Sequence, residues 1–192
     1  MIEAASRAMN GVNIPNRKCT REEILDMFKS QMSRLKVRLN VCQVFLLTLL
    51  HYLQVNLIQS PAVAGEISLT CDAWQASNTD GYFSVTGHWI EESRPGVWEV
   101  QSALLGFTRL NNSHNSKHLG GALFKIVDRL GISDRVKWYA PTIAINLSNT
   151  ASQIGHITAD NASNNDTMME FFAKYIEKRT KKSFPYKDCR IR

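Results

Sequence analysis

Hydrophobic and polar residues alternate along the central part of the chain at the spacing of β-strands. The alternation predicts strands over residues 67–72, 82–90 and 97–107, separated by polar turns that contain Gly or Pro. Strands that follow one another this closely usually pair with each other, which predicts an antiparallel meander. A short apolar run at residues 157–159 predicts one more buried strand, much later in the chain.

Apolar residues at helical spacing occur on both sides of these strands. Thr20 and Glu23 form a capping box that predicts a helix start. The apolar stripe of this helix is Ile24, Leu25, Phe28, Met32 and Leu35. A second helix is predicted over residues 119–130, ending at Gly131, and its core positions are Leu119, Leu123, Ile126, Val127 and Leu130. A third helix is predicted over residues 167–180, after a polar turn of Asn and Ser.

Two carboxylates stand at the ends of predicted strands. Asp72 ends the first strand, and Asp160 directly follows the strand at residues 157–159. Open α/β sheets place their chemistry at such strand ends, and carboxylates held together there suit Mg²⁺. An Asp before a helix is also a common N-cap. For Asp160 taken alone, the N-cap role is favoured over the role of a metal ligand. Trp74 is interpreted as a structural anchor at the strand end rather than a base-stacking residue.

Three segments stand out: ISLTCDAWQASNTDGYFSVTG at residues 67–87, SALLGFTRL at residues 102–110 and GHITADNASNNDTMM at residues 155–169. Together they resemble the catalytic core of hAT-superfamily DNA transposases. The resemblance implies an RNase H-like fold in which Asp72 and Asp160 match the first two acids of an Asp-Asp-Glu triad. In intact relatives such acids hold Mg²⁺ or Mn²⁺ for DNA strand cleavage and transfer.

The resemblance covers most of residues 66–135 and 154–192 and, more weakly, the first forty residues. The implied fold class is α/β, an incomplete RNase H-like fold with a mixed sheet: an antiparallel three-strand meander plus a parallel strand, with flanking helices. We expect a helical lead-in at residues 1–65 and a partial transposase core at residues 66–192. In the family, the third acid and the dimerisation region lie beyond the position of Arg192, and a zinc finger commonly comes first. We therefore expect no nuclease or transposase activity.

Two stretches do not fit the resemblance. Residues 41–59 are strongly apolar and lack Asp, Glu, Lys and Arg, and residues 136–153 separate segments that the family joins almost directly. Both begin with Val and end with Gln, which is compatible with the GT and AG boundaries of an intron. We hypothesise that both are in-frame introns read as protein, and genomic or transcript sequences without splice signals at these junctions would exclude this. For residues 41–59, a membrane-spanning helix or a buried or partner-binding helix are the alternatives.

Basic residues are concentrated near the C-terminus of a chain with a net charge of +6. Such a segment suits contacts with DNA phosphates, and the residues predicted to make them are Lys178, Arg179, Lys181 and Lys182. A solvated helix end with basic residues near its C-terminus accounts for the pattern equally well. His114 and His118 have no third ligand nearby and the four cysteines have no zinc spacing, so no further cofactor is predicted.

The sequence therefore predicts a remnant of a hAT-type transposase catalytic domain that is catalytically inactive in this form. Its expected partner is DNA, and its expected location is the nucleus. One alternative is a non-catalytic fragment that binds nucleic acid or protein, with salt-sensitive and sequence-independent DNA binding as its signature. The other is a small membrane-anchored protein held by residues 41–59, which the polar residues in that stretch make less favourable.

Overall fold

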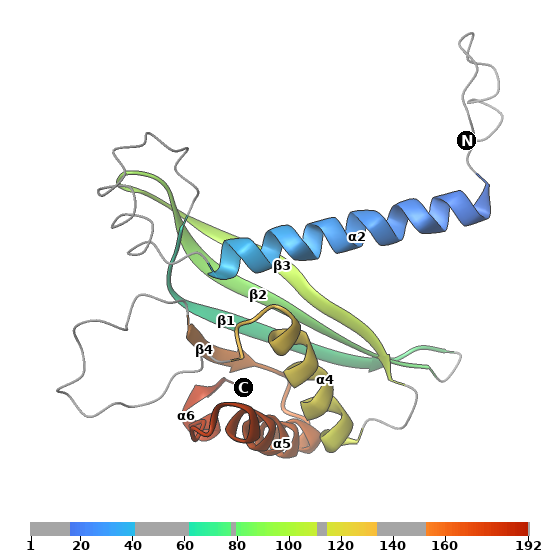
Figure 1. The fold of residues 1–192 in the computed structure, drawn as a ribbon. Coiled ribbons are helices and arrows are strands. Elements are labelled where there is room, and N and C mark those ends of the chain that lie inside the picture. Colours follow the sequence, from blue (N-terminus) through green and yellow to red (C-terminus); the bar gives the residue numbers. More distant parts are fainter. Residues whose placement is uncertain (1–15, 41–61, 78–79, 111–114, 134–152, 192) are drawn as a thin grey trace, which may run out of the picture. The chain divides into compact units, whose positions relative to one another are not determined.

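The computed structural model of the chain describes residues 16–40, 62–77, 80–110, 115–133 and 153–191 (Figure 1). The chain divides into two compact units, Met1–Arg34 and Leu35–Arg192. The domain boundary expected at residue 65 stays a prediction. Residues 41–59 and most of the second unmatched stretch lie outside the described residues, so the intron and membrane-anchor hypotheses stay open. Among the described helices, none is both long enough and apolar enough to cross a membrane.

Helix α2 (Arg17–Asn40) begins three residues before the predicted start at Thr20. Asn16 rather than Thr20 caps it: the Asn16 side-chain oxygen accepts a hydrogen bond from the backbone N–H of Cys19 at 2.9 Å. Only part of the predicted apolar stripe is buried. Leu35 is buried, as is Leu39 one turn later, whereas the residues nearer the N-terminus are exposed: Ile24, Leu25 and Phe28.

Five strands form one mixed sheet in the order β3-β2-β1-β4-β5. Strands β1 (Ala62–Gln75), β2 (Gly81–Arg94) and β3 (Val97–Leu110) form an antiparallel meander. Strand β4 (Gln153–Thr158) pairs in parallel with β1, and β5 (Arg190–Ile191) pairs in parallel with β4. The predicted fold class is confirmed, because the meander and the parallel strand are those of an RNase-like sheet.

The meander strands have one covered face and one open face. On β2, the buried side chains of Phe83, Val85 and Trp89 lie on the covered face, as the alternation predicts. The intervening residues, such as Tyr82 and Ser84, lie on the open face and are only partly buried. Each meander strand is longer than predicted, because residues beyond the alternating run still pair with the neighbouring strand.

Helices α4 (Ser116–Arg129) and α5 (Ser163–Thr180) pack together beside the sheet (Figure 1). Glycines let these elements approach closely. A Cβ atom at Gly106 of β3 would lie 2.5 Å from Cγ1 of Ile126 on α4, and one at Gly120 of α4 would lie 2.8 Å from the carbonyl oxygen of Met168 on α5. The α4–α5 pair therefore forms a continuous core with the covered face.

The predicted core positions of α4 are confirmed. All five are buried: Leu119, Leu123, Ile126, Val127 and Leu130. Gly131 has a positive φ of 72° after the last turn, the conformation that glycine tolerates at a helix end. Helix α5 starts at Ser163, so the polar residues read as a turn before the helix form its first turn. The C-terminal segment contains α6 (Tyr186–Cys189) and then β5.

Candidate nucleic-acid interface

Asp72 does not end β1 as predicted but lies three residues before its last residue, Gln75, whereas Asp160 follows the end of β4. In the parallel pair β1–β4, Leu69 is opposite Ile157 and Thr70 is opposite Thr158. The same register carried two residues further aligns Asp72 with Asp160, just beyond the last residue of β4. Both aspartates are exposed. The sequence prediction that two strands bring their carboxylates to one edge therefore agrees with the strand register.

Asp160 also has a structural role. Its Oδ1 accepts a hydrogen bond from the backbone N–H of Ala162 at 3.0 Å and another from the side-chain amide of Asn165. The Arg190 guanidinium donates to the Asp160 carbonyl oxygen at 3.2 Å. The N-cap residue of α5 is Ala162, so Asp160 is not the cap itself. Instead it fixes the turn that leads from β4 into α5, as Asp side chains commonly do.

A small hollow of about 270 Å³ lies beside Asp160. The residues that line it are Ala73, Trp74, Gln75, Leu119, Asp160, Ala162, Asn164 and Asn165. Carboxylate and amide oxygens of this kind are suitable ligands for Mg²⁺. Within the described ranges, no group of three or more His, Cys, Asp or Glu side chains that could hold a metal is found. The edge thus presents two carboxylates, which suit an ion that keeps several waters.

Cys71 lies directly before this edge and points into the core. It is buried, and its burial raises the pKa of the thiol from 9.0 to about 12. Its neighbour Asp72 points to the opposite side because successive strand residues alternate. Cys71 is therefore a packing residue, and it presents no reactive thiolate to the edge at neutral pH.

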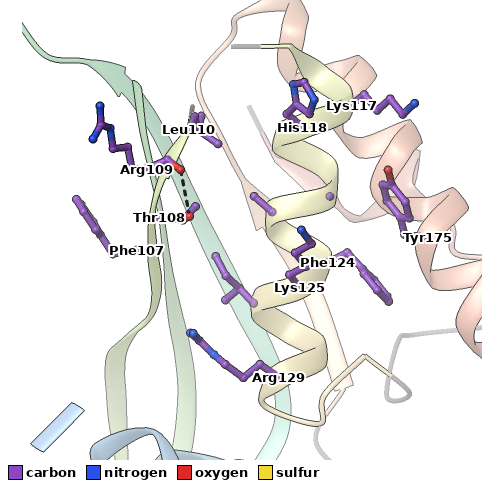
Figure 2. A pocket seen from close by; sticks show the side chains of 13 residues that line it. Phe107, Thr108, Arg109, Leu110, Lys117, His118, Phe124, Lys125, Arg129 and Tyr175 are labelled. Atoms are coloured by element: carbon purple, nitrogen blue, oxygen red, sulfur yellow. Dashed lines mark hydrogen bonds between the residues drawn. The ribbon is translucent and has the colours of Figure 1, made fainter. Parts of the chain in front are cut away.

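A larger groove of about 760 Å³ runs between the edge strand β3 and helix α4 (Figure 2). We call it the basic groove. It is lined by Phe107, Thr108, Arg109, Leu110, Lys117, His118, Gly121, Ala122, Phe124, Lys125, Ile126, Arg129 and Tyr175. Four of these residues are Lys or Arg, and none is Asp or Glu. The lining is therefore cationic at neutral pH, whatever the protonation of His118.

Local structure explains the shape of the basic groove. The side chain of Asn115 caps α4 by accepting from the Lys117 N–H at 3.0 Å, which fixes where the helix begins. Lys125 and Arg129 are four residues apart and so lie on the same side of the helix, whereas Figure 2 shows Lys117 pointing away from β3. Arg129 spans to the sheet, donating to the Leu105 carbonyl oxygen at 3.0 Å. Figure 2 shows His118, Lys125 and Arg129 on the side of α4 that borders β3.

The basic groove was missed in the sequence because its two walls are separated in the chain. The available signal was the four-residue spacing of Lys125 and Arg129 within the helix predicted over residues 119–130. The residues predicted to contact DNA lie elsewhere, at the C-terminal end of α5: Lys178, Arg179, Lys181 and Lys182. They are exposed and none lines the basic groove. Their place in and after the last helical turn also agrees with the alternative of a solvated helix end.

Residues 70–144 match the family profile described as the ZBED1 RNase-like domain. The matched range includes Asp72, the meander from the end of β1 and the basic groove up to Arg129, whereas Asp160 lies outside it. The "Putative transcriptional regulator tpeD" of Talaromyces stipitatus is 24% identical over 124 residues, which is 65% of this chain and 12% of that protein. No solved structure matches the chain. The chain is thus similar to ZBED- and hAT-type proteins, and it spans a small part of the relative's length.

Proposed function

We propose that the chain derives from the catalytic domain of a hAT-type DNA transposase and now binds DNA without cleaving it. The observation that carries this proposal is the basic groove, whose lining has four Lys or Arg residues and no Asp or Glu; of the four, Arg109 is ion-paired with Asp80 outside the lining. DNA phosphates are the natural partner of such a surface, and each contact releases counterions. The ancestry is supported by the ZBED1-type match and by the register that aligns Asp72 with Asp160.

The two carboxylates would hold Mg²⁺ or Mn²⁺, together with water. Both hydrogen bonds to the Asp160 carboxylate fall on Oδ1, so Oδ2 is the oxygen that it offers to an ion. When bound, such an ion would polarise a phosphate oxygen or an attacking water. In the family that the sequence resembles, three acids support strand cleavage, and the described part of this chain brings two to the edge. We propose that these two carboxylates bind such an ion.

A nuclear site of action follows from the same proposal. The relative from Talaromyces stipitatus is named as a transcriptional regulator, and a regulator acts where the DNA is. No specific observation in the described residues favours the membrane-anchored alternative, which depends on residues 41–59. DNA binding by the basic groove also agrees with the alternative from the sequence, a non-catalytic fragment that binds nucleic acid.

The test uses the full chain with a short DNA duplex and with a supercoiled plasmid. We expect duplex binding that weakens steeply as the salt concentration rises, and no nicked plasmid in Mg²⁺ or Mn²⁺. The double variant Lys117→Ala, Lys125→Ala removes two groove charges. Its matched control, Lys178→Ala with Lys182→Ala, removes the same charge from the end of α5. Greater loss of binding in the groove variant supports the proposal.

Two results would contradict it. If the α5 variant loses binding and the groove variant does not, the DNA contact lies at the helix end. Metal-dependent nicking that disappears in Asp72→Ala would show that the chain is an active nuclease. Ion binding is measured separately, as Mn²⁺-induced broadening of the NMR signals of Asp72 and Asp160, which Asp72→Asn should reduce.

A further inference from the structure

Three aromatic side chains gather on the open face of the meander: Trp74, Tyr82 and Phe107, which we call the aromatic cluster. The ring centroids of Trp74 and Tyr82 are 5.8 Å apart, and those of Tyr82 and Phe107 are 5.5 Å apart, both pairs with nearly parallel rings. The third pair, Trp74 with Phe107, is tilted at 5.7 Å. The cluster is a preformed surface of aromatic rings rather than a set of separate side chains.

Strand register builds the aromatic cluster. Trp74 is directly opposite Tyr82 in the β1–β2 pair, and Phe107 is opposite Ser84, diagonal to Tyr82, in the β2–β3 pair. Residues opposite and diagonal on one face are within reach of large rings. Trp74 is 38% exposed and Phe107 is 54% exposed. Trp74 was interpreted from the sequence as a structural anchor, and it packs against Tyr82 and Phe107 while remaining partly exposed.

The aromatic cluster adjoins both polar sites. Trp74 lines the hollow beside Asp160. At the other end, Phe107 and Arg109 also belong to the lining of the basic groove. Figure 2 shows their side chains on the side of β3 away from α4, so the cluster and the groove meet around this edge strand. Arg109 forms an ion pair with Asp80 beside the cluster. The aromatic cluster and the basic groove therefore lie on opposite sides of β3 and meet at this edge strand, while Trp74 connects the cluster to the hollow beside Asp160.

We propose that this surface around β3 binds single-stranded nucleic acid, with bases on the aromatic cluster and phosphates along the basic groove. The proposal rests on the proposed DNA binding and specifies the form of nucleic acid. Exposed aromatic rings beside a cationic groove are the combination that binds unpaired strands, because every unpaired base offers a flat face for stacking. In a duplex those base faces are already stacked on one another, so the cluster would gain little from it.

An apolar protein partner fits this surface less well. Arg109 lies beside the aromatic rings, and Lys125 and Arg129 lie across β3 in the basic groove. Burying Lys125 and Arg129 against an apolar partner would remove the solvation of their charges. A nucleic-acid strand satisfies both halves of the surface, since it carries flat bases and anionic phosphates on one chain. Its backbone can follow the groove while neighbouring bases turn toward the rings.

The experiment measures binding of the full chain to fluorescein-labelled dT12, rU12 and a 12-base-pair duplex by anisotropy at one salt concentration. We expect tighter binding of a single strand than of the duplex. Trp74→Leu and Phe107→Leu remove the ring and keep an apolar side chain. Each should weaken single-strand binding about 5- to 150-fold, the range for loss of one base–aromatic stack. The matched control is Trp98→Leu, which removes another exposed tryptophan of β3, outside the cluster.

The outcomes separate this inference from the proposed function. A preference for dT12 or for rU12 supports the inference and identifies the natural strand. Equal binding of duplex and single strands, with no greater effect of Trp74→Leu than of Trp98→Leu, overturns it. DNA binding through the groove survives that result if Lys125→Ala still weakens the duplex complex. Absence of binding to every probe overturns both. Circular dichroism of each variant checks that the fold is retained.

Discussion

The two faces of the meander are made by the same strands and differ in almost every physical respect. On β2, Phe83 and Val85 are fully buried on the covered face, whereas Tyr82 and Ser84 between them reach the open face. The covered face packs against helices and carries the core. The open face keeps aromatic and polar side chains accessible. One period-two pattern thus provides stability on one side and a binding surface on the other.

The ion pairs of the two faces differ in the same way. Glu91 of β2 is 1% exposed and accepts from Arg38 of α2 at 2.5 Å to Nε and from Trp89 Nε1 at 2.8 Å. The hydrogen bond to Glu91 raises the pKa of Arg38 above its ordinary value. The Arg109–Asp80 pair near the aromatic cluster is far more exposed. Buried pairs are costly to break, while exposed pairs contribute little.

The largest expected contrast is between one phenylalanine on each face. Phe83→Ala should lower the free energy of unfolding by about 3–5 kcal/mol, because it leaves a cavity in the core. Phe107→Ala should lower it by less than about 1 kcal/mol, since the ring is half exposed. Urea denaturation followed by circular dichroism measures both. Similar losses for the two variants would show that the open face is packed in solution and would remove it as a binding surface.

The ion pairs give the second contrast. Glu91→Gln removes the buried carboxylate charge and leaves Arg38 without its counter-charge, so we expect a loss of about 2–3 kcal/mol in unfolding free energy. Asp80→Asn, the matched change at the exposed pair, should cost at most about 1 kcal/mol. Urea denaturation is again the measurement. A cost for Asp80→Asn as large as that for Glu91→Gln would contradict the distinction between the faces.

Two glycines at the basic groove give a smaller contrast. Gly106→Ala places Cβ 2.5 Å from Ile126, so β3 and α4 must separate, at a cost of about 1–3 kcal/mol. Gly121→Ala meets only the Tyr175 ring, at 3.6 Å, and should stabilise α4 by about 0.5–1 kcal/mol. Thermal unfolding of the two variants should therefore shift in opposite directions. A shift in the same direction would mean that the close approach at Gly106 does not determine the width of the groove.

The sequence predicted what depends on local periodicity. The alternation over β2 placed Phe83, Val85, Gly87 and Trp89 on one face, and the helical stripe of α4 identified its buried residues, because both patterns record which side chains leave water. The start of α2 was wrong because Asn16, one turn earlier, offered an equally good cap. Strand β5 was not predicted, since two residues are too few to show a period and its pairing depends on β4.

Candidate site residues could be named from the sequence only where their position after a single apolar run was enough to indicate them. Asp72 and Asp160 each follow an apolar run, so the sequence could single out both, and their role as a site stays a prediction. The basic groove and the aromatic cluster depend on which residues face each other across separate elements. Trp74 meets Tyr82 only through the β1–β2 register, and Lys125 meets β3 only through the packing of α4. Pairing and packing of this kind leave no periodic trace in the chain.

The smallest expected effect on stability at neutral pH comes from ionisation of Cys71, whose side chain lies on the covered face next to Asp72. Burial raises the pKa of its thiol from 9.0 to about 12, so the folded state holds the proton that the unfolded state releases above pH 9. Stability from this residue is fully present below pH 9 and declines between pH 9 and about 12, by at most about 1.4 kcal/mol per pH unit.

Urea denaturation of the chain and of Cys71→Ala from pH 7 to 11 measures the difference between the two slopes. We expect parallel behaviour up to pH 9 and a steeper decline of the unsubstituted chain above it. Identical slopes would mean that the thiol reaches water in solution, and that this end of the covered face opens next to Asp72.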